Sequence, residues 1–305
     1  MFLELRHLRG LKAIQTRGSL SGAAEGMHLT QSALSHQIRS LEEYFGAPLF
    51  FRRTRPLRWT PAGERLLALA DELLPRVEAA ERVLKDTGAG QQGRLHMALE
   101  CHSCFDWLMP TMDRYRQEWP QVELDLSMGF SFHPLPALYR GEVDLVITSD
   151  PEELGGLDYV PLFRYEMLLA VARRHPLAGR EWIAPEDLRN ETVISYPVCR
   201  NRLDIYHRFL DPAGVQPAAE RRAELTVMLI QLVANRRGVA ALPNWALREY
   251  LGRDNLKGLQ LGPDGLWSTL YAAVRSEDRH APYMDAFLQL ARERTSQTLS
   301  GIEPL

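Results

Sequence analysis

Near the start of the chain, apolar side chains recur at intervals of three or four residues, the period of helices that are packed on one side. The first of these segments runs from about Leu5 to Ile14. A second begins within GSLSGAAEGM, where Ser19 or Ser21 can cap a helix, and Thr30 can cap a third, TQSALSHQIRSLEEYFG. The pattern predicts two helices, a tight turn and a third helix, which is the order found in a helix-turn-helix.

The predicted third helix separates its apolar side chains from its polar ones. The apolar side consists of residues that fall three or four positions apart: Leu34, Ile38, Leu41 and Phe45. The other side consists of polar residues that are free to contact a partner: Gln31, Ser32, Ser35, His36 and Arg39. We therefore expect one side of this helix to pack and the other to read a ligand.

Arginines gather after the third helix. The segment APLFFRRTRPLRWTP alternates apolar and basic residues around Pro56, as a two-stranded wing does, and its arginines would lie near phosphates: Arg52, Arg53, Arg55 and Arg58. Residues 1–60 hold nine basic and four acidic side chains, although the whole chain has a net charge of −3. A basic segment on an acidic body favours a polyanionic partner, so we expect this segment to bind DNA. A three-helix bundle with a solvated basic face is the alternative.

Residues 60–87 form one long amphipathic stretch. Its apolar positions fit alternating steps of three and four residues, the seam of a helix pair: Leu66, Ala70, Leu73, Val77, Ala80 and Leu84. The pattern predicts a dimerisation helix with a kink at Pro75, followed by a linker in TGAGQQG. A surface helix packed on its own domain is the alternative.

From Arg94 onward, short β-rich runs alternate with helical ones. The strand candidates are RLHMALE, VELDLSM, VDLVITS, MLLAVA, TVISY, GVAALP and LYAAVR. Such alternation predicts an α/β body of parallel strands joined by crossover helices. Ligands of open α/β sheets bind at the carboxyl ends of the strands, so we expect a binding cleft there.

Composition and motifs exclude several classes of protein. Hydrophobic residues make up 45% and charged residues 25% of the chain, as in globular proteins, and the apolar runs are too short to span a membrane. The start of the chain shows no secretory signal, and three cysteines are too few for a disulfide framework, so we expect a cytoplasmic location. No common nucleophile, phosphate-loop, zinc-protease or paired-carboxylate motif is present, so we expect no catalytic residues and no enzyme.

The segment ECHSC carries two cysteines three positions apart, Cys101 and Cys104, at the end of the first predicted strand of the body. Three interpretations are open: a redox dithiol, part of a metal site, or small apolar side chains that line a cleft. A metal site needs more ligands at suitable spacing, and no second C-x-x-C is present, so we expect no metal. The apolar interpretation is favoured, with the Ser103 hydroxyl and nearby amides facing a cleft.

Several segments of the chain resemble a known protein family. SLSGAAEGMHLTQSALSHQIRSLEEYFGAPLFFRRTRPLRWTPAGERLL is similar to the DNA-binding segment of LysR-type transcriptional regulators, and family-like phrases continue in EWPQVELDL, GEVDLVIT, HPLA and RGVAALPNW. The resemblance implies that the third helix enters the major groove of promoter DNA. The DNA-binding residues that it implies are Thr30, Gln31, Ser32, Ser35, His36, Arg39, Arg52, Arg53 and Arg55.

The same resemblance implies a fold in three parts: a winged helix-turn-helix at residues 1–60, a linker and dimerisation helix at residues 61–88, and an effector-binding domain at residues 89–305. The last part would consist of two α/β subdomains of periplasmic-binding-protein type: subdomain I at about residues 89–161 and 268–305, and subdomain II at about residues 162–267. The chain would cross between them near Val160–Phe163 and near Trp267–Leu270.

Further phrases resemble a subgroup of this family that regulates methionine biosynthesis in response to homocysteine: ECHSC, WPQVE, LVITSD, YPVCRNRLD, FLDPAGV, LPNW and LWSTLYAAVR. The subgroup implies homocysteine as co-inducer, a homodimer or homotetramer, and RNA polymerase as a further partner. The ammonium group of such a ligand needs a carboxylate, for which Glu100 and Asp150 are suitable. The other candidate effector-binding residues are Cys101, Ser103, Phe130, Ser131, Thr148, Ser149, Tyr196 and Arg202.

Overall fold

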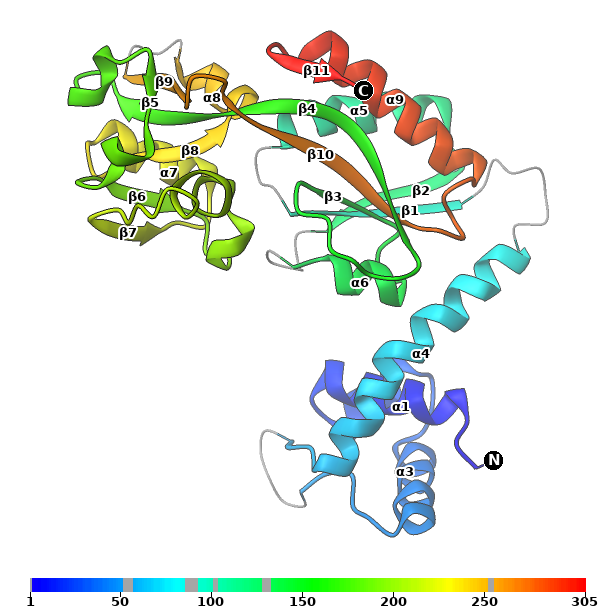
Figure 1. The fold of residues 1–305 in the computed structure, drawn as a ribbon. Helices are drawn as coiled ribbons and strands as arrows, with labels where there is room; N and C mark the ends of the chain where they lie inside the picture. Colours follow the sequence, from blue (N-terminus) through cyan, green and yellow to red (C-terminus); the bar gives the residue numbers. More distant parts are fainter. Residues whose placement is uncertain (1, 52–56, 86–92, 101–103, 128–132, 252–254) are drawn as a thin grey trace. The chain divides into compact units, whose positions relative to one another are not determined.

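The structure is a computed structural model that describes residues 2–51, 57–85, 93–100, 104–127, 133–251 and 255–305. The chain forms two compact units, one mainly of residues 1–87 and one mainly of residues 88–305. Figure 1 shows their helices and strands.

The first unit is helical. Its helices are α1 (Leu5–Arg17), α2 (Leu20–Gly26), α3 (Gln31–Phe45) and α4 (Pro61–Lys85). The expected caps are in place: Ser19 Oγ accepts a hydrogen bond from the Gly22 amide at 3.1 Å, and Thr30 Oγ1 accepts one from the Ala33 amide at 3.2 Å. The predicted order of two helices, a turn and a third helix is confirmed.

The core of the first unit fixes the position of α3. Leu34, Ile38 and Leu41 are buried, as the spacing of apolar residues predicted. A Cβ atom on Gly10 would lie 3.1 Å from Leu34 Cδ1, so the glycine allows α1 and α3 to approach closely. Phe45, which was expected on the same buried side, is exposed because it is the last residue of the helix.

The first half of α4 packs on its own unit. Ala70 and Leu74 are buried in one cluster with Leu8 of α1. The heptad pattern had placed Ala70 in an intermolecular seam; this assignment is wrong for Ala70, because it lies on the side of α4 that packs on α1. Leu73 and Val77 are partly exposed, and α4 continues through Pro75.

The second unit is built on a nine-stranded sheet and a separate parallel pair, β6 and β7. The strands are β1 (Gly93–Leu99), β2 (Val122–Ser127), β3 (Leu145–Thr148), β4 (Leu157–Ala172), β5 (Trp182–Ile183), β6 (Thr192–Ser195), β7 (Ala219–Arg222), β8 (Ala240–Pro243), β9 (Leu256–Leu261), β10 (Leu266–Arg275) and β11 (Ile302–Pro304). The helices are α5 (Phe105–Glu118), α6 (Leu135–Arg140), α7 (Thr226–Ala234), α8 (Asn244–Leu251) and α9 (Pro282–Thr298).

Two long strands connect two lobes of this unit. The first lobe contains β1 to β3 with α5, α6 and α9, and the second contains β5 to β9 with α7 and α8 (Figure 1). Strands β4 and β10 run antiparallel to each other through both lobes. The ranges in which we expected the chain to cross, 160–163 and 267–270, lie within these two strands.

The sheet is mixed, which corrects the expectation of a parallel one. Strand β1 is parallel to β2 and β3, and β5 is parallel to β9, as βαβ units require. Strand β10 is antiparallel to β3 and β4, and β4 is antiparallel to β8 and β9. The reason is the connection: β4 carries the chain out of the first lobe, and β10 carries it back.

A buried ion cluster joins three strands of the first lobe. Asp144 is 4% exposed and accepts hydrogen bonds from Arg94 Nε at 2.8 Å, from an Arg275 guanidinium nitrogen at 2.9 Å and from the His96 amide at 3.0 Å. Burial by itself would raise the pKa of Asp144, but the hydrogen bonds and charge of Arg94, with help from His96 and Arg275, lower it. Asp144 is therefore held as a carboxylate between β1, β3 and β10.

Candidate DNA interface and effector pocket

The polar side of α3 is open to solvent in the first unit. Gln31, Ser32, His36 and Arg39 are exposed, and so is the capping residue Thr30. Ser35 was expected on the same side and is partly buried. Because α3 begins at Gln31, its first amides and the positive end of its dipole lie beside these side chains, an arrangement that suits a phosphate.

The base of the wing follows α3. Phe50 pairs with Trp59 as an antiparallel bridge, and the Phe51 amide donates to the Arg58 carbonyl at 2.9 Å. Thr60 closes this hairpin by donating to the Pro48 carbonyl at 2.6 Å. The wing residues that we expected to contact phosphates, Arg52, Arg53 and Arg55, lie outside the described residues.

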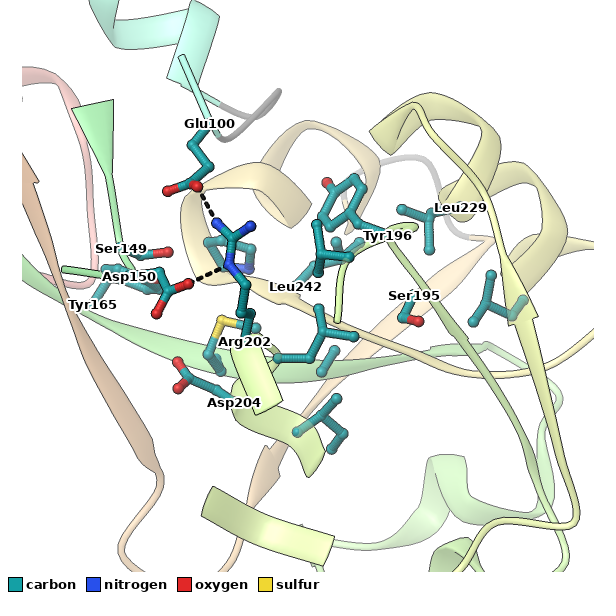
Figure 2. Close-up of a pocket in the computed structure, with 17 residues that line it drawn as sticks. Glu100, Ser149, Asp150, Tyr165, Ser195, Tyr196, Arg202, Asp204, Leu229 and Leu242 are labelled. Carbon is teal, nitrogen blue, oxygen red and sulfur yellow. Dashed lines mark hydrogen bonds and ion pairs between the residues drawn. The ribbon is translucent and has the colours of Figure 1, made fainter. Parts of the chain in front are cut away.

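The second unit holds a pocket of about 100 Å³ between its two lobes (Figure 2). A buried water needs roughly 10–15 Å³ by the same measure, so the pocket has room for a molecule of several heavy atoms, such as a small amino acid. Residues of both lobes line it: Glu100, Ser149, Asp150, Tyr165, Met167, Ile194, Ser195, Tyr196, Val198, Arg202, Leu203, Asp204, Ile205, Leu229, Ala241, Leu242 and Pro243.

An arginine connects the lobes inside this pocket. Arg202 belongs to a short 3₁₀ turn of the second lobe, whereas Glu100 follows β1 and Asp150 follows β3 in the first lobe. The Arg202 guanidinium donates to both carboxylates, as the dashed lines in Figure 2 mark. Thr148 Oγ1 donates to Glu100 and accepts from the Asp150 amide at 3.0 Å. The two strand ends and the turn thus meet in one charged network.

Glu100 is the most perturbed acid of this network. Burial raises the pKa of Glu100 to about 7, although the hydrogen bond from Thr148 and the charge of Arg202 oppose the shift. The side chain of Glu100 is 9% exposed and that of Arg202 is 18% exposed. A site of this kind gains or loses a charge near neutral pH.

The remainder of the pocket is mostly apolar. Met167, Leu229 and Leu242 line it, together with Tyr165. The Tyr196 hydroxyl is hydrogen-bonded to Thr226 Oγ1 at 2.6 Å, which fixes the orientation of the ring in the pocket wall. Such a pocket suits a ligand with a charged end and a short apolar end.

The candidate effector residues fall into two groups. Ser149, Tyr196 and Arg202 line the pocket, and Thr148 lies behind it as the hydrogen-bond donor to Glu100. Four others lie outside the described residues: Cys101, Ser103, Phe130 and Ser131. Sequence reasoning missed Asp204 and the strand residues Tyr165, Met167 and Leu242, whose burial pattern is that of any core strand.

Cys104 is fully buried at the start of α5, within the main core cluster of the first lobe. Buried thiols in apolar surroundings are inert, so Cys104 fits the expectation of a small apolar side chain, but it packs in the core and is not among the residues that line the pocket. In the described part of the chain, no three His, Cys, Asp or Glu side chains gather as ligands for a metal ion. Nor do the described helices include one that is long and apolar enough to cross a membrane.

Comparison with known proteins decides the family. A family model described as the bacterial regulatory helix-turn-helix protein of the lysR family matches residues 5–64, and one described as the LysR substrate binding domain matches residues 88–296. The chain belongs to the LysR family of transcriptional regulators. It is therefore a DNA-binding regulator and not an enzyme, and the α/β fold class expected from the sequence is confirmed.

Several transcriptional regulators named MetR match along almost the whole chain. The HTH-type transcriptional regulator MetR of Escherichia coli K12 is 46% identical over 301 residues, which cover 99% of this chain and 93% of the relative. MetR of Haemophilus influenzae is 45% identical over 304 residues, which cover 100% and 98%. The solved regulatory domain of MetR from Neisseria meningitidis is 45% identical with a TM-score of 0.64, and covers 70% of this chain and 98% of that domain. The subgroup resemblance is confirmed.

Proposed function

We propose that this regulator controls genes of methionine biosynthesis in response to homocysteine, which it binds in the pocket between the lobes of its second unit. The observation that carries the proposal is the identity of 45–46% to MetR proteins over both units, DNA-binding and effector-binding alike. Because the similarity to MetR proteins covers both units, we expect this chain to recognise the same kind of operator and effector.

Promoter DNA is the first partner in this proposal. Helix α3 enters the major groove, and the polar residues on one side of it contact base edges. These are Gln31, Ser32, Ser35, His36 and Arg39, with Thr30 at the start of the helix. The wing arginines Arg52, Arg53 and Arg55 contact phosphates and hold the helix in register.

Homocysteine is the second partner. It is a small α-amino acid with a thiol, and the pocket combines a charged end around Arg202 with an apolar end around Leu242. Thr148, Ser149 and Tyr196 supply hydroxyl groups at or behind the wall. Cys101, Ser103, Phe130 and Ser131 complete the proposed set, and the first two come shortly after the pocket residue Glu100 in the sequence.

The protein acts as a homodimer or homotetramer in the cytoplasm, with RNA polymerase as a further partner at the promoter. Two linked copies read two half-sites, which gives the sequence information that one copy lacks. The partly exposed apolar side chains of α4, Leu66, Leu69, Leu73 and Val77, supply a surface for the second copy.

A binding experiment with the full-length protein tests this function. Fluorescence anisotropy with promoter fragments of methionine-biosynthesis genes and with scrambled DNA, across a salt series, measures specificity and charge contribution. We expect tighter binding to the promoter fragments, affinity that falls steeply with salt, and a change of affinity with homocysteine but not with cysteine or methionine. Equal affinity for all DNA, or no response to homocysteine, would refute the corresponding half of the proposal.

A further inference from the structure

The arginine at the centre of the pocket already occupies the place that suits a ligand's cationic group. Arg202 reaches from the second lobe and lies between Glu100 and Asp150 of the first, as Figure 2 shows. Its partners come from positions 102 and 52 residues away in the sequence. The chain thus pairs its own cation with the two carboxylates of the cleft.

The charges lining the pocket do not balance. Among the described residues they are Glu100, Asp150, Asp204 and Arg202, three carboxyl groups and a guanidinium. Asp204 has separate partners, because it accepts a hydrogen bond from Ser268 Oγ at 2.5 Å and pairs with Arg208 at 3.5 Å. Glu100 and Asp150 therefore share Arg202, and a ligand that brought only a negative charge would compete with them for it.

From these contacts we propose that the pocket takes the zwitterionic head group of an α-amino acid by charge exchange. The ligand's ammonium replaces the Arg202 guanidinium on Glu100 and Asp150, and the ligand's carboxylate pairs with the guanidinium that is released. This inference rests on the proposed function in taking the pocket as the effector site, and it adds the residues that decide the ligand class.

Burial explains why both charges of the ligand are needed. Glu100 and Arg202 are largely removed from solvent, so each loses much free energy if it is left without a partner. A zwitterion leaves every charge paired: the ammonium serves the carboxylates and the carboxylate serves the arginine. A ligand with the carboxylate alone would leave Glu100 without a cationic partner, and a ligand with the amine alone would leave Arg202 without an anionic one.

The exchange also changes what holds the lobes together. In the structure, Arg202 bridges the lobes directly through Glu100 and Asp150. With the ligand in place, the bridge runs through the amino acid. An effector that replaces one bridge by another has different affinities for two arrangements of the lobes, which is the requirement for a ligand to shift a conformational equilibrium.

Matched ligand analogues test the exchange. The full-length protein is titrated calorimetrically with homocysteine, with 4-sulfanylbutanoate, which lacks the amine, and with 3-sulfanylpropan-1-amine, which lacks the carboxylate. Both analogues should bind at least about 100-fold more weakly than homocysteine, because sites with buried polar groups reject ligands that leave those groups unpaired. Methionine, cysteine and homoserine are titrated in parallel.

Variants assign the charges to residues. Glu100→Gln should reduce discrimination against the analogue without the amine, and Arg202→Gln should reduce discrimination against the analogue without the carboxylate. Arg200→Gln is the matched control, because Arg200 pairs with Asp211 and Glu220, neither of which lines the pocket. Thermal unfolding shows that each variant is folded before its titration is interpreted.

The outcomes separate this inference from the proposed function. If homocysteine binds but both analogues bind within about threefold of it, or if Arg202→Gln keeps full discrimination, the exchange is wrong and the proposed function stands. If another amino acid binds with the expected head-group dependence and homocysteine does not, the exchange stands and the proposed effector is wrong. If no α-amino acid binds, the exchange is refuted.

Discussion

Lowering the pH from 8 to 6 should weaken amino-acid binding about tenfold, because the carboxylate that receives the ligand's ammonium loses its charge. Burial raises the pKa of Glu100 to about 7. The ionised fraction of such a group falls from about 90% at pH 8 to about 10% at pH 6, as for any single titrating acid. Only the ionised form pairs with an ammonium, so affinity rises with pH through 7 and levels off above about 8.

The direction of this pH dependence follows from the raised pKa of Glu100. A carboxyl group with an ordinary pKa near 4.5 would be fully ionised across this range, and binding would not depend on its protonation. Because the pKa of Glu100 is raised, a ligand that needs the carboxylate must expel a proton at pH 6. Binding should therefore release close to one proton at pH 6 and almost none at pH 8.

Calorimetry of the full-length protein at pH 6, 7 and 8, in two buffers of different ionisation enthalpy, measures both the affinity and the proton count. Glu100→Gln is the control, since it keeps the shape of the side chain and cannot ionise. The variant should bind more weakly than the wild-type protein at pH 8 and show little pH dependence. An unchanged wild-type affinity between pH 6 and 8, or the same pH dependence in the variant, would refute the role of Glu100.

Three further predictions concern DNA reading and folding. Gln31→Ala should cost about 1–3 kcal/mol of discrimination between the operator and a mutated operator, whereas Arg52→Ala should weaken binding to all sequences alike. Anisotropy titrations with both DNAs distinguish the two effects. If the two variants lost affinity and discrimination in the same way, the DNA-contacting face of α3 would be assigned wrongly. Asp144→Ala should lower the free energy of unfolding by about 3–5 kcal/mol in chemical denaturation, because it removes the buried carboxylate that Arg94 and Arg275 share, and a loss below about 1 kcal/mol would contradict this. Gly63→Ala should destabilise the first unit, since a Cβ atom there would lie 2.1 Å from the Leu49 carbonyl oxygen, and unchanged thermal unfolding would show that the loop yields.

Local elements of the fold were predictable because their signals lie close together in the sequence. Ser19 and Thr30 cap the helices that they were expected to cap, and the apolar spacing of Leu34, Ile38 and Leu41 marked the buried side of α3. These assignments need no more than helical geometry and the hydrogen-bonding needs of a helix start.

The directions of the long strands and the centre of the pocket were harder to predict. Nothing local indicates that β4 and β10 pair antiparallel along two lobes, since each is simply an apolar run. Arg202 was a candidate, yet its partners Glu100 and Asp150 lie far away in the sequence, and only the meeting of two strand ends with a turn brings them together. Ala70 is a case in which a local pattern misled. Its heptad position predicted an intermolecular seam, but in the structure Ala70 is buried against α1.

A pocket residue is hydrogen-bonded to β10, the strand that returns the chain to the first lobe. Asp204 lines the pocket and accepts a hydrogen bond from Ser268 Oγ of β10, to which Arg208 also donates at 3.1 Å. Ser268 is paired in register with Tyr165 of β4, another residue of the pocket wall. A ligand in the pocket would therefore lie against β4, and Asp204 links the pocket wall to β10 through one hydrogen bond.

The central claim is that an amino acid in the pocket changes how the protein binds its operator. It is tested most directly by measuring operator affinity with and without saturating homocysteine, and homocysteine affinity with and without saturating operator, on the same full-length protein. Thermodynamic linkage requires the two ratios to be equal. We predict ratios that agree and differ clearly from one, by about 5-fold or more. Homocysteine that binds tightly while both ratios equal one would contradict the account.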